Sequence, residues 1–162
     1  MHKKNVKDSK TIISILVTPE KSNNHGTMHG GEIMRLMDET AYVVAKKHCS
    51  CDVSIVTARV DELEFFKPIH IEDVVTVLGE IVFVGKSSME VYVKVKVDHL
   101  SCGARETNMA LSAYFTMVAK DDEGNRYEVP RLMLHTKEEK EKYELGKKRY
   151  LKYKEKRKRR EG

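Results

Sequence analysis

The chain has 162 residues, of which 40% are hydrophobic and 34% charged, and its net charge is +5. This length predicts one domain with room for a core and excludes two ordinary enzyme domains. The charge is uneven: residues 137–160 hold thirteen Lys or Arg and five Glu, whereas residues 1–136 hold seventeen basic and nineteen acidic residues. The pattern predicts a near-neutral domain at 11–135 and a basic helical tail at 136–162.

Several signals of location and covalent chemistry are missing from the sequence. No run of about 18 apolar residues predicts a membrane span, and no apolar stretch behind the first charges suits a secretory signal, so we expect a cytoplasmic protein. The three cysteines, Cys49, Cys51 and Cys102, have no framework spacing and argue against a disulfide scaffold. Cys49-Ser50-Cys51 is not a usual zinc motif, so we expect no metal.

The first half of the chain predicts one strand and one long helix. Residues 1–10 are expected to fray. A strand follows at 11–17 and stops at Thr18-Pro19, and the polar residues 20–28 form a loop. The helix is expected at 29–48, with basic residues in its last turn that suit the negative end of the helix dipole.

The second half changes to the two-residue period of strands. Strands are predicted at 53–66, 74–84, 89–98 and 105–119, joined by the connector 67–73 and by turns at 85–88 and 101–103. A last helix at 137–160 carries Tyr143, Tyr150 and Tyr153 as a weak docking stripe, and its basic end is expected to fray.

This order predicts an α+β fold in which an antiparallel sheet of about five strands wraps one long central helix, with a C-terminal helix added. One helix cannot cover both faces of such a sheet. We therefore expect a second copy of the chain to bury the remaining apolar surface, in an obligate dimer or a larger assembly.

The helix at 29–48 carries two unusual features. Its apolar residues recur at three-and-four spacing, at positions 33, 34, 37, 41, 44 and 45, and Asp38 falls inside this stripe. A carboxylate there is costly unless something pairs with it or uses it. The pair Gly30-Gly31 opens the helix and lets another group approach free backbone N–H donors. Together these features indicate a site for a polarised carbonyl.

The spacing of these features constrains the chemistry. The Gly31 N–H is our candidate oxyanion donor, but Asp38 lies seven residues further on, about 10 Å along a helix. If both act on one carbonyl, they come from different chains of a dimer. Asn23 and Asn24 could hold a water or the carbonyl, and Asp38 would act as general base or as nucleophile.

Each feature also has a purely structural interpretation. Asp38 could pair with polar groups across a subunit interface. Gly30-Gly31 could only permit close packing of the helix against the sheet, and Asn23 and Asn24 could be ordinary turn residues.

Several short segments between residues 11 and 155 match one family pattern. They are Asn23-Asn24-His25-Gly26-Thr27-Met28-His29-Gly30-Gly31, Ile33-Met34, Met37-Asp38-Glu39, Ala41, Val56-Thr57-Ala58, the residues 65–68 and 85–91, and Lys148-Arg149-Tyr150-Leu151. In these segments the chain resembles the acyl-CoA thioesterases of the hotdog fold. The resemblance is strongest to bacterial broad-range acyl-CoA hydrolases, which are similar to the two halves of the brain-type cytosolic acyl-CoA hydrolase.

The resemblance implies hydrolysis of acyl-CoA to a free acid and coenzyme A, with no metal or cofactor. It places the family's acid at Asp38, its loop asparagine at Asn23 with Asn24 as a rival, and its oxyanion glycine at Gly30 or Gly31. His25 stands where some relatives carry asparagine and receives no catalytic role. The implied assembly is a dimer, commonly built into a trimer of dimers.

Coenzyme A carries several negative charges that need donors. Lys86, Ser87 and Ser88 lie in a predicted turn where they could bind its phosphates, although an ordinary hairpin turn would look the same. Val56 and Thr57 could offer strand-edge backbone groups to the pantetheine arm, and Arg149 in the tail could reach the adenosine phosphates of a neighbouring subunit.

Two other functions compete with this interpretation. The chain could be a non-catalytic hotdog acyl-CoA sensor, or a nucleic-acid-associated protein that uses its basic tail. The lack of a helix-turn-helix or a stacking platform disfavours nucleic acid, and a pure binder leaves Asp38 unexplained. A hydratase would want a catalytic histidine beside the acid, and His29 is assigned to the loop.

Overall fold

The computed structural model describes residues 2–49, 52–100 and 106–161. Cys51, Cys102, the predicted turn at 101–103 and the predicted strand start at Arg105 lie outside them. In chain order the elements are β1 (Lys3–Asn5), α1 (Val6–Ser9), β2 (Thr11–Leu16), η1 (Pro19–Lys21), α2 (Gly30–His48), β3 (Ser54–Phe65), β4 (Val74–Val84), β5 (Ser88–His99), β6 (Glu106–Lys120), β7 (Arg131–Met133) and α3 (Lys137–Glu161).

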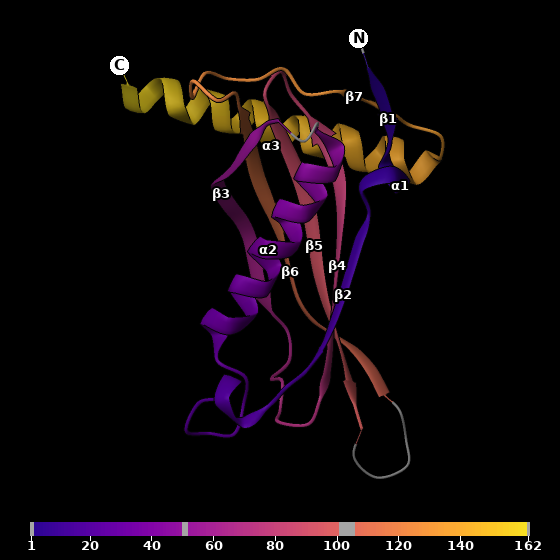
Figure 1. Ribbon diagram of the computed structural model, residues 1–162, viewed down its shortest axis with the longest axis vertical. Helices are drawn as coiled ribbons and strands as arrows, with labels where there is room; N and C mark the ends of the chain where they lie inside the picture. Colours follow the sequence, from indigo (N-terminus) through magenta and orange to yellow (C-terminus); the bar gives the residue numbers. More distant parts are fainter. Residues whose placement is uncertain (1, 50–51, 101–105, 162) are drawn as a thin grey trace.

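The main sheet has five antiparallel strands in the order β2-β4-β5-β6-β3. It curves around α2, which runs along its inner face (Figure 1). Inward-facing residues of β4, β5 and β6 are fully buried against the helix, and Val77, Val93 and Ala113 have no exposed surface. The α+β architecture predicted from the sequence, with one helix wrapped by about five strands, is confirmed.

The buried face of α2 is rotated from the one that the sequence predicts. Its buried residues are Ile33, Leu36, Met37, Thr40, Ala41, Val44, Ala45 and His48. Successive helix residues are 100° apart, so this stripe leaves Met34 39% exposed and Asp38 on its flank, half-buried. The prediction that Asp38 lies inside the buried stripe is wrong for the single chain.

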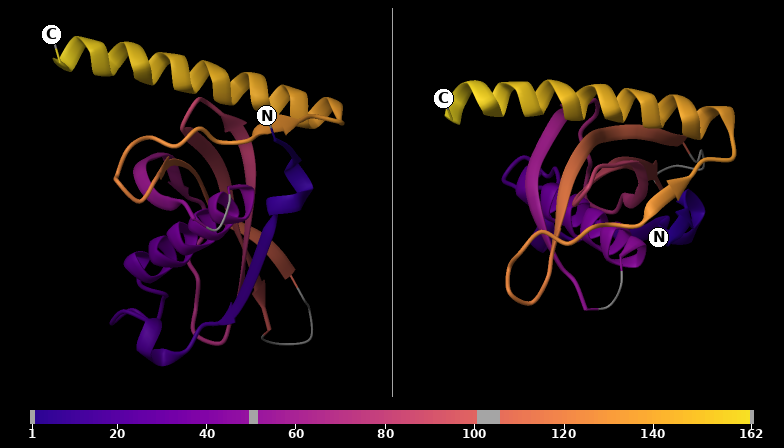
Figure 2. Two further views of the ribbon diagram at one scale, coloured as in Figure 1. Left: turned by 45° about the horizontal axis from the view of Figure 1, so that its top comes forward. Right: turned by 90° about the horizontal axis from the view of Figure 1, so that it is seen from above.

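The outer face of the sheet is partly covered by α3, which crosses the strands at one end of the molecule (Figure 2). The Phe83 ring on β4 packs against Tyr143, at 5.0 Å between ring centroids, and Tyr150, at 5.3 Å. A Cβ on Gly146 would lie 2.6 Å from the Phe83 Cβ, so only glycine permits this approach. The tyrosine stripe therefore faces the sheet, and it covers surface that we expected a second copy to bury.

The start of the chain differs from the frayed segment expected at residues 1–10. β1 pairs in parallel with β7, with Lys3 opposite Arg131, and α1 contributes the buried residues Val6 and Ser9. The Lys4 ammonium also donates to the carbonyl oxygens of Lys47, at 2.9 Å, and Cys49, at 3.3 Å. These contacts come from residues distant in sequence, so no local pattern could have predicted them.

A buried histidine closes the C-terminal end of α2. His48 is fully buried, and its Nε2 lies 2.8 Å from the carbonyl oxygen of Pro130. Burial away from water lowers the pKa of His48 below its ordinary value, because the imidazolium form loses hydration. The folded chain thus favours the neutral ring.

This shift predicts a pH dependence of stability. Neutral His48 makes its full contribution to the free energy of unfolding above the ordinary histidine pKa, near 6.5. This contribution is lost as the pH falls through the lowered pKa of the folded state, and the free energy of unfolding then falls by at most about 1.4 kcal/mol per pH unit. Between roughly pH 7.5 and pH 5.5, the free energy of unfolding in urea should fall further for wild type than for His48→Gln, which keeps the donor to Pro130. His25→Gln, at an exposed histidine, is the control, and equal slopes for wild type and His48→Gln would contradict the prediction.

One edge of the sheet leaves large apolar side chains exposed. β3 has β6 on one side only within the described residues, and Val56 and Phe65 on this strand are 41% and 56% exposed. Met34 and Tyr42 on α2 are 39% and 42% exposed.

No helix in the part of the chain that the structure describes has both the length and the apolar composition of a membrane span.

Candidate functional site

A hydrogen bond joins the acid of α2 to the edge strand β3. The Thr57 hydroxyl donates to Asp38 Oδ1 at 2.6 Å. The pairing of β3 with β6 shifts register between Thr57 and Arg59, so Ala58 bulges from the ladder. The bond fixes one oxygen of the Asp38 carboxylate and leaves the other available at the exposed edge.

The start of α2 presents a second polar group. His29 caps the helix, and its Nδ1 accepts a hydrogen bond from the Gly31 N–H at 3.2 Å. The donor that the sequence suggested for an oxyanion is therefore occupied by this ring in the free chain. A Cβ on Gly30 would lie 4.0 Å from two ring carbons of Phe65, so an exposed aromatic ring flanks the helix start.

The loop before α2 is ordered by Asn23. The Asn23 Oδ1 accepts from the His25 N–H at 2.9 Å and from the Thr27 N–H at 3.3 Å, and its Nδ2 lies 2.9 Å from the Thr27 hydroxyl oxygen. These bonds make Asn23 the organiser of a turn, the structural role that the sequence left open. Asn24 is exposed.

The Asp38 carboxylate and the Gly31 N–H cannot meet within one chain. α2 is continuous from Gly30 to His48, and its rise places Asp38 about 10 Å beyond Gly31 along the axis. Within one chain, Asp38 in the middle of α2 and the Gly31 N–H at its start are therefore too far apart to act on one carbonyl, as the sequence predicts.

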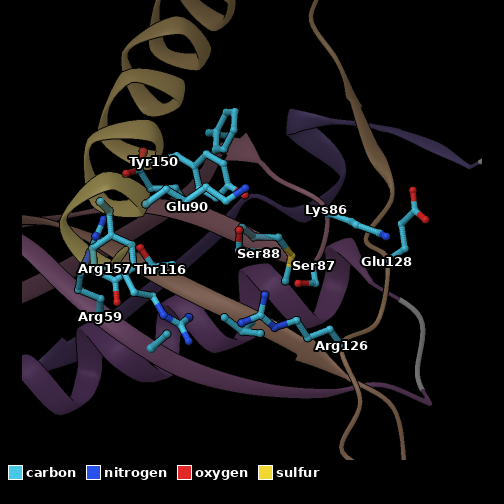
Figure 3. Close-up of a pocket in the computed structure, with 16 residues that line it drawn as sticks. Arg59, Lys86, Ser87, Ser88, Glu90, Thr116, Arg126, Glu128, Tyr150 and Arg157 are labelled. Atoms are coloured by element: carbon cyan, nitrogen blue, oxygen red, sulfur yellow. The ribbon is translucent and has the colours of Figure 1, made fainter. Parts of the chain in front are cut away.

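A cavity of about 430 Å³ lies between α3 and the outer face of the sheet. The turn residues Lys86, Ser87 and Ser88 line one end of it, and Ala58 and Arg59 of β3 line another. Figure 3 shows Arg59, Arg157 and Arg126 around the same cavity. Its lining includes Lys86, Lys154 and these three arginines but only two acids, Glu90 and Glu128, so the cavity suits an anionic ligand.

Arg149 takes a different position from the one suggested by the sequence. Its guanidinium makes a bidentate ion pair with Glu90, with Nε–Oε1 and Nη2–Oε2 distances of 2.9 and 2.8 Å. It also stacks over the Tyr114 ring at 3.7 Å. Glu90 is only 5% exposed, so Arg149 holds α3 to the sheet within its own chain.

Apart from Arg149, the structure therefore groups the predicted site residues in three places. Asp38 and Thr57 meet at the β3 edge beside Val56, the turn Lys86–Ser88 lines the cavity, and Asn23, Asn24, Gly30 and Gly31 lie at the start of α2. Sequence reasoning missed the bond from Thr57 to Asp38, the Arg59 side of the cavity and the Phe65 ring. The adjacent motif residues Val56, Thr57 and Ala58 were the available signal, but no spacing rule links residue 57 to residue 38.

No cluster of metal ligands appears among these groups. In the part of the chain that the structure describes, no three His, Cys, Asp or Glu side chains gather to hold a metal ion. Burial raises the pKa of the Cys49 thiol to about 11, so this cysteine is a poor nucleophile.

Comparisons with known sequences place similar proteins in one family. The pattern of the Thioesterase superfamily matches residues 25–103. The chain is 41% identical over 133 residues to YkhA of Bacillus subtilis, an uncharacterised acyl-CoA thioester hydrolase, and the match covers 82% of this chain and 75% of that protein. It is 40% identical over 149 residues to the human cytosolic acyl coenzyme A thioester hydrolase, covering 92% of this chain. The chain spans about two fifths of the mammalian relatives' length, since the match covers 39% of the human protein.

Solved structures give the same result. An apo-hexameric acyl-CoA thioesterase superposes with a TM-score of 0.86 at 34% identity, covering 100% of this chain and 99% of the other. The acyl-CoA hydrolase of Staphylococcus aureus, solved with butyryl coenzyme A, coenzyme A and coenzyme A disulfide, gives a TM-score of 0.86 at 33% identity, covering 98% and 94% of the two chains. The same enzyme has been solved with an aspartate, a threonine or an asparagine replaced by alanine.

Proposed function

The chain belongs to the Thioesterase superfamily, and from this premise we propose that it hydrolyses acyl-CoA to a free fatty acid and coenzyme A. The hotdog resemblance seen in the sequence is confirmed by the same matches. The observation that carries the proposal is the bond from Thr57 to Asp38, at a strand edge next to a basic cavity. The human relative is named cytosolic, and we place this chain in the cytoplasm as well.

Asp38 acts as general base in this proposal. Thr57 holds one carboxylate oxygen, and the other takes a proton from a water molecule as the water oxygen bonds to the thioester carbon. The carbon–sulfur bond then breaks, and the sulfur leaves as the coenzyme A thiol with that proton. Direct attack by Asp38 on the thioester carbon, to form an anhydride that water then hydrolyses, is the alternative chemistry.

The helix start of a second chain supplies the oxyanion donor. The Gly31 N–H, with the neighbouring Gly30 N–H, binds the thioester oxygen once the carbonyl replaces the His29 ring. Asn23, with Asn24 beside it, shapes this end of the site. The exposed ring of Phe65 beside Gly30 offers an apolar wall for the acyl chain.

This arrangement requires a dimer that brings Asp38 of one chain to Gly31 of the other. The exposed apolar residues of β3 and α2 supply the surface for such a dimer. The hexameric relative supports a larger assembly, which we propose to be a trimer of dimers.

The basic cavity is the proposed site of the coenzyme A phosphates. Lys86, Ser87 and Ser88 offer a charge and two hydroxyls, and the exposed residues Val56 and Thr57 lie where the pantetheine arm would cross β3 toward Asp38. Arg149, fixed by Glu90, shapes the cavity by holding α3 in place. No metal or further cofactor enters the proposal, because coenzyme A is part of the substrate.

The proposal is tested by measuring release of free thiol from acyl-CoAs of increasing chain length by the wild-type protein. Saturable turnover on at least one acyl-CoA supports it, and the panel fixes the preferred length. Tight binding of acyl-CoA with no turnover on any chain length would overturn the proposal in favour of a ligand sensor.

The phosphate site makes a separate prediction. Lys86→Met removes an exposed cation from the cavity rim and should raise KM for acyl-CoA about tenfold, which is about 1.4 kcal/mol of binding energy, with kcat little changed. The difference should shrink at about 0.5 M salt, because ions screen an exposed charge. Lys96→Met, on β5 outside the cavity lining, is the matched control, and an equal rise in KM for both variants would contradict the assignment.

A further inference from the structure

A buried carboxylate links the sheet to the loop that precedes α2. Asp73, at the end of the connector before β4, is 5% exposed. Its Oδ2 accepts from the His70 N–H at 2.7 Å, and its Oδ1 lies 2.8 Å from His99 Nδ1 at the end of β5. A carboxylate only accepts hydrogen bonds, so His99 Nδ1 carries the proton in this pair.

The turn that Asp73 closes is attached to the loop that carries Asn23. The Met28 N–H donates to the Ile69 carbonyl at 2.7 Å, and the Ile71 N–H approaches the Gly26 carbonyl at 3.4 Å. An isolated bridge also pairs Thr27 with His70. The loop at residues 22–29 therefore rests on the turn at 69–73 through backbone bonds on both sides of His70.

The turn at residues 69–73 is also bonded to Val17, which follows strand β2. The Glu72 N–H donates to the Val17 carbonyl, and the Val17 N–H donates to the Asp73 carbonyl, both at 2.9 Å. Glu72 has a φ of 71°, which is the left-handed region that side chains rarely adopt. A turn held in such a conformation needs its surroundings to fix it, and the Asp73 side chain supplies two of those contacts.

We propose that Asp73 and His99 are positioning residues for the reaction, which hold the loop carrying Asn23 and the start of α2 through the turn at residues 69–73. The inference rests on the proposed function, because it assigns the loop and the helix start to the active site. Neither residue touches substrate. They fix the place of the groups that polarise the thioester carbonyl.

The Asp73–His99 pair lies far from the proposed phosphate site, so its effect on catalysis can be measured apart from binding of coenzyme A. Asp73 precedes Val74, the first residue of β4, whereas the cavity lies near Val84, at the other end of that strand. Ten residues of strand span about 33 Å. Loss of the pair should therefore disturb the helix start while leaving the phosphate site unchanged.

The test compares Asp73→Ala, His99→Ala and His99→Asn in the whole 162-residue chain. The Asn Nδ2 occupies the place of the His Nδ1, so His99→Asn keeps the donor to Asp73. We expect both alanine variants to lower kcat by roughly 10- to 100-fold, as displaced catalytic groups do, with KM within about twofold of wild type, and His99→Asn to recover most of kcat. Glu72→Gln, at an exposed neighbouring carboxylate whose side chain makes no described contact, is the control and should match wild type.

Hydrogen exchange separates a local effect from general loss of structure. In Asp73→Ala, amides of residues 22–29 should lose protection while those of β5 and β6 keep it. Two outcomes would overturn this inference and leave the proposed function standing. In the first, the wild type is active and both alanine variants keep its kcat. In the second, the alanine variants lose protection from exchange uniformly over the chain. A wild type without thioesterase activity would overturn the proposed function together with the catalytic role of the pair.

Discussion

Asp38→Asn is expected to lower kcat for acyl-CoA hydrolysis by a factor of about 10² to 10⁴, the usual contribution of a positioned general base. The amide keeps the size of the carboxylate and can still accept the hydrogen bond from Thr57, which is 2.6 Å long in the wild type. It cannot take a proton from water. The measurement is thiol release at saturating acyl-CoA, with the oligomeric state checked by size-exclusion chromatography.

A neighbouring carboxylate provides the matched control. Glu39 is the next residue along α2, is exposed and pairs only with Arg35 among the contacts described for it. Glu39→Gln removes the same charge from the same helix turn and should leave kcat within about twofold of wild type, because a surface ion pair contributes little. Equal losses in the two variants would show that helix charge, and not Asp38 chemistry, sets the rate.

Arg149→Met is expected to lower the free energy of unfolding by roughly 3 kcal/mol, because it leaves the carboxylate of Glu90 buried without its partner. Glu90 is 5% exposed and holds Arg149 through two hydrogen bonds. Methionine keeps much of the packing volume under α3. The measurement is denaturant unfolding at a fixed protein concentration, monitored by circular dichroism.

The adjacent residue Lys148, which is exposed, separates loss of the pair from loss of tail charge. Lys148→Met should change stability by at most about 0.5 kcal/mol, as expected for a surface position. The double variant Glu90→Gln/Arg149→Met should recover part of the loss, since it removes the unpaired charge. If Arg149→Met and Lys148→Met are equally stable, the ion pair does not hold α3 to the sheet.

The fold followed from local patterns wherever those patterns were strong. The two-residue alternation of residues 89–98 and the three-and-four spacing of 29–48 each correspond to an element of the structure, β5 and α2. The predictions from local patterns fail where contacts between residues distant in sequence determine the secondary structure. Residues 3–9 carry no strong periodicity, and β1 forms only because residues 131–133 lie beside it.

The candidate site was predictable in its residues more than in its contacts. The sequence suggested Asp38, Thr57 and Lys86, but it assigned Thr57 to coenzyme A through its backbone, whereas the structure directs its hydroxyl to Asp38. It also treated Arg149 as a phosphate ligand, although Glu90, 59 residues earlier, binds it. Pairings between side chains distant in sequence depend on strand register and helix docking, which local composition does not specify.

The pairing of β1 with β7 has a consequence for how the protein is made. Lys3 and Arg131 are partners in this small sheet, so the first strand has no mate until most of the chain has been translated. At about 5 to 20 residues synthesised per second, the wait is roughly 6 to 25 s. The five-stranded sheet and α2 can assemble during that interval, whereas β1 and the contacts of Lys4 with the end of α2 come last. The newly synthesised chain therefore leaves the C-terminal end of its central helix uncovered until residues 131–133 have been made.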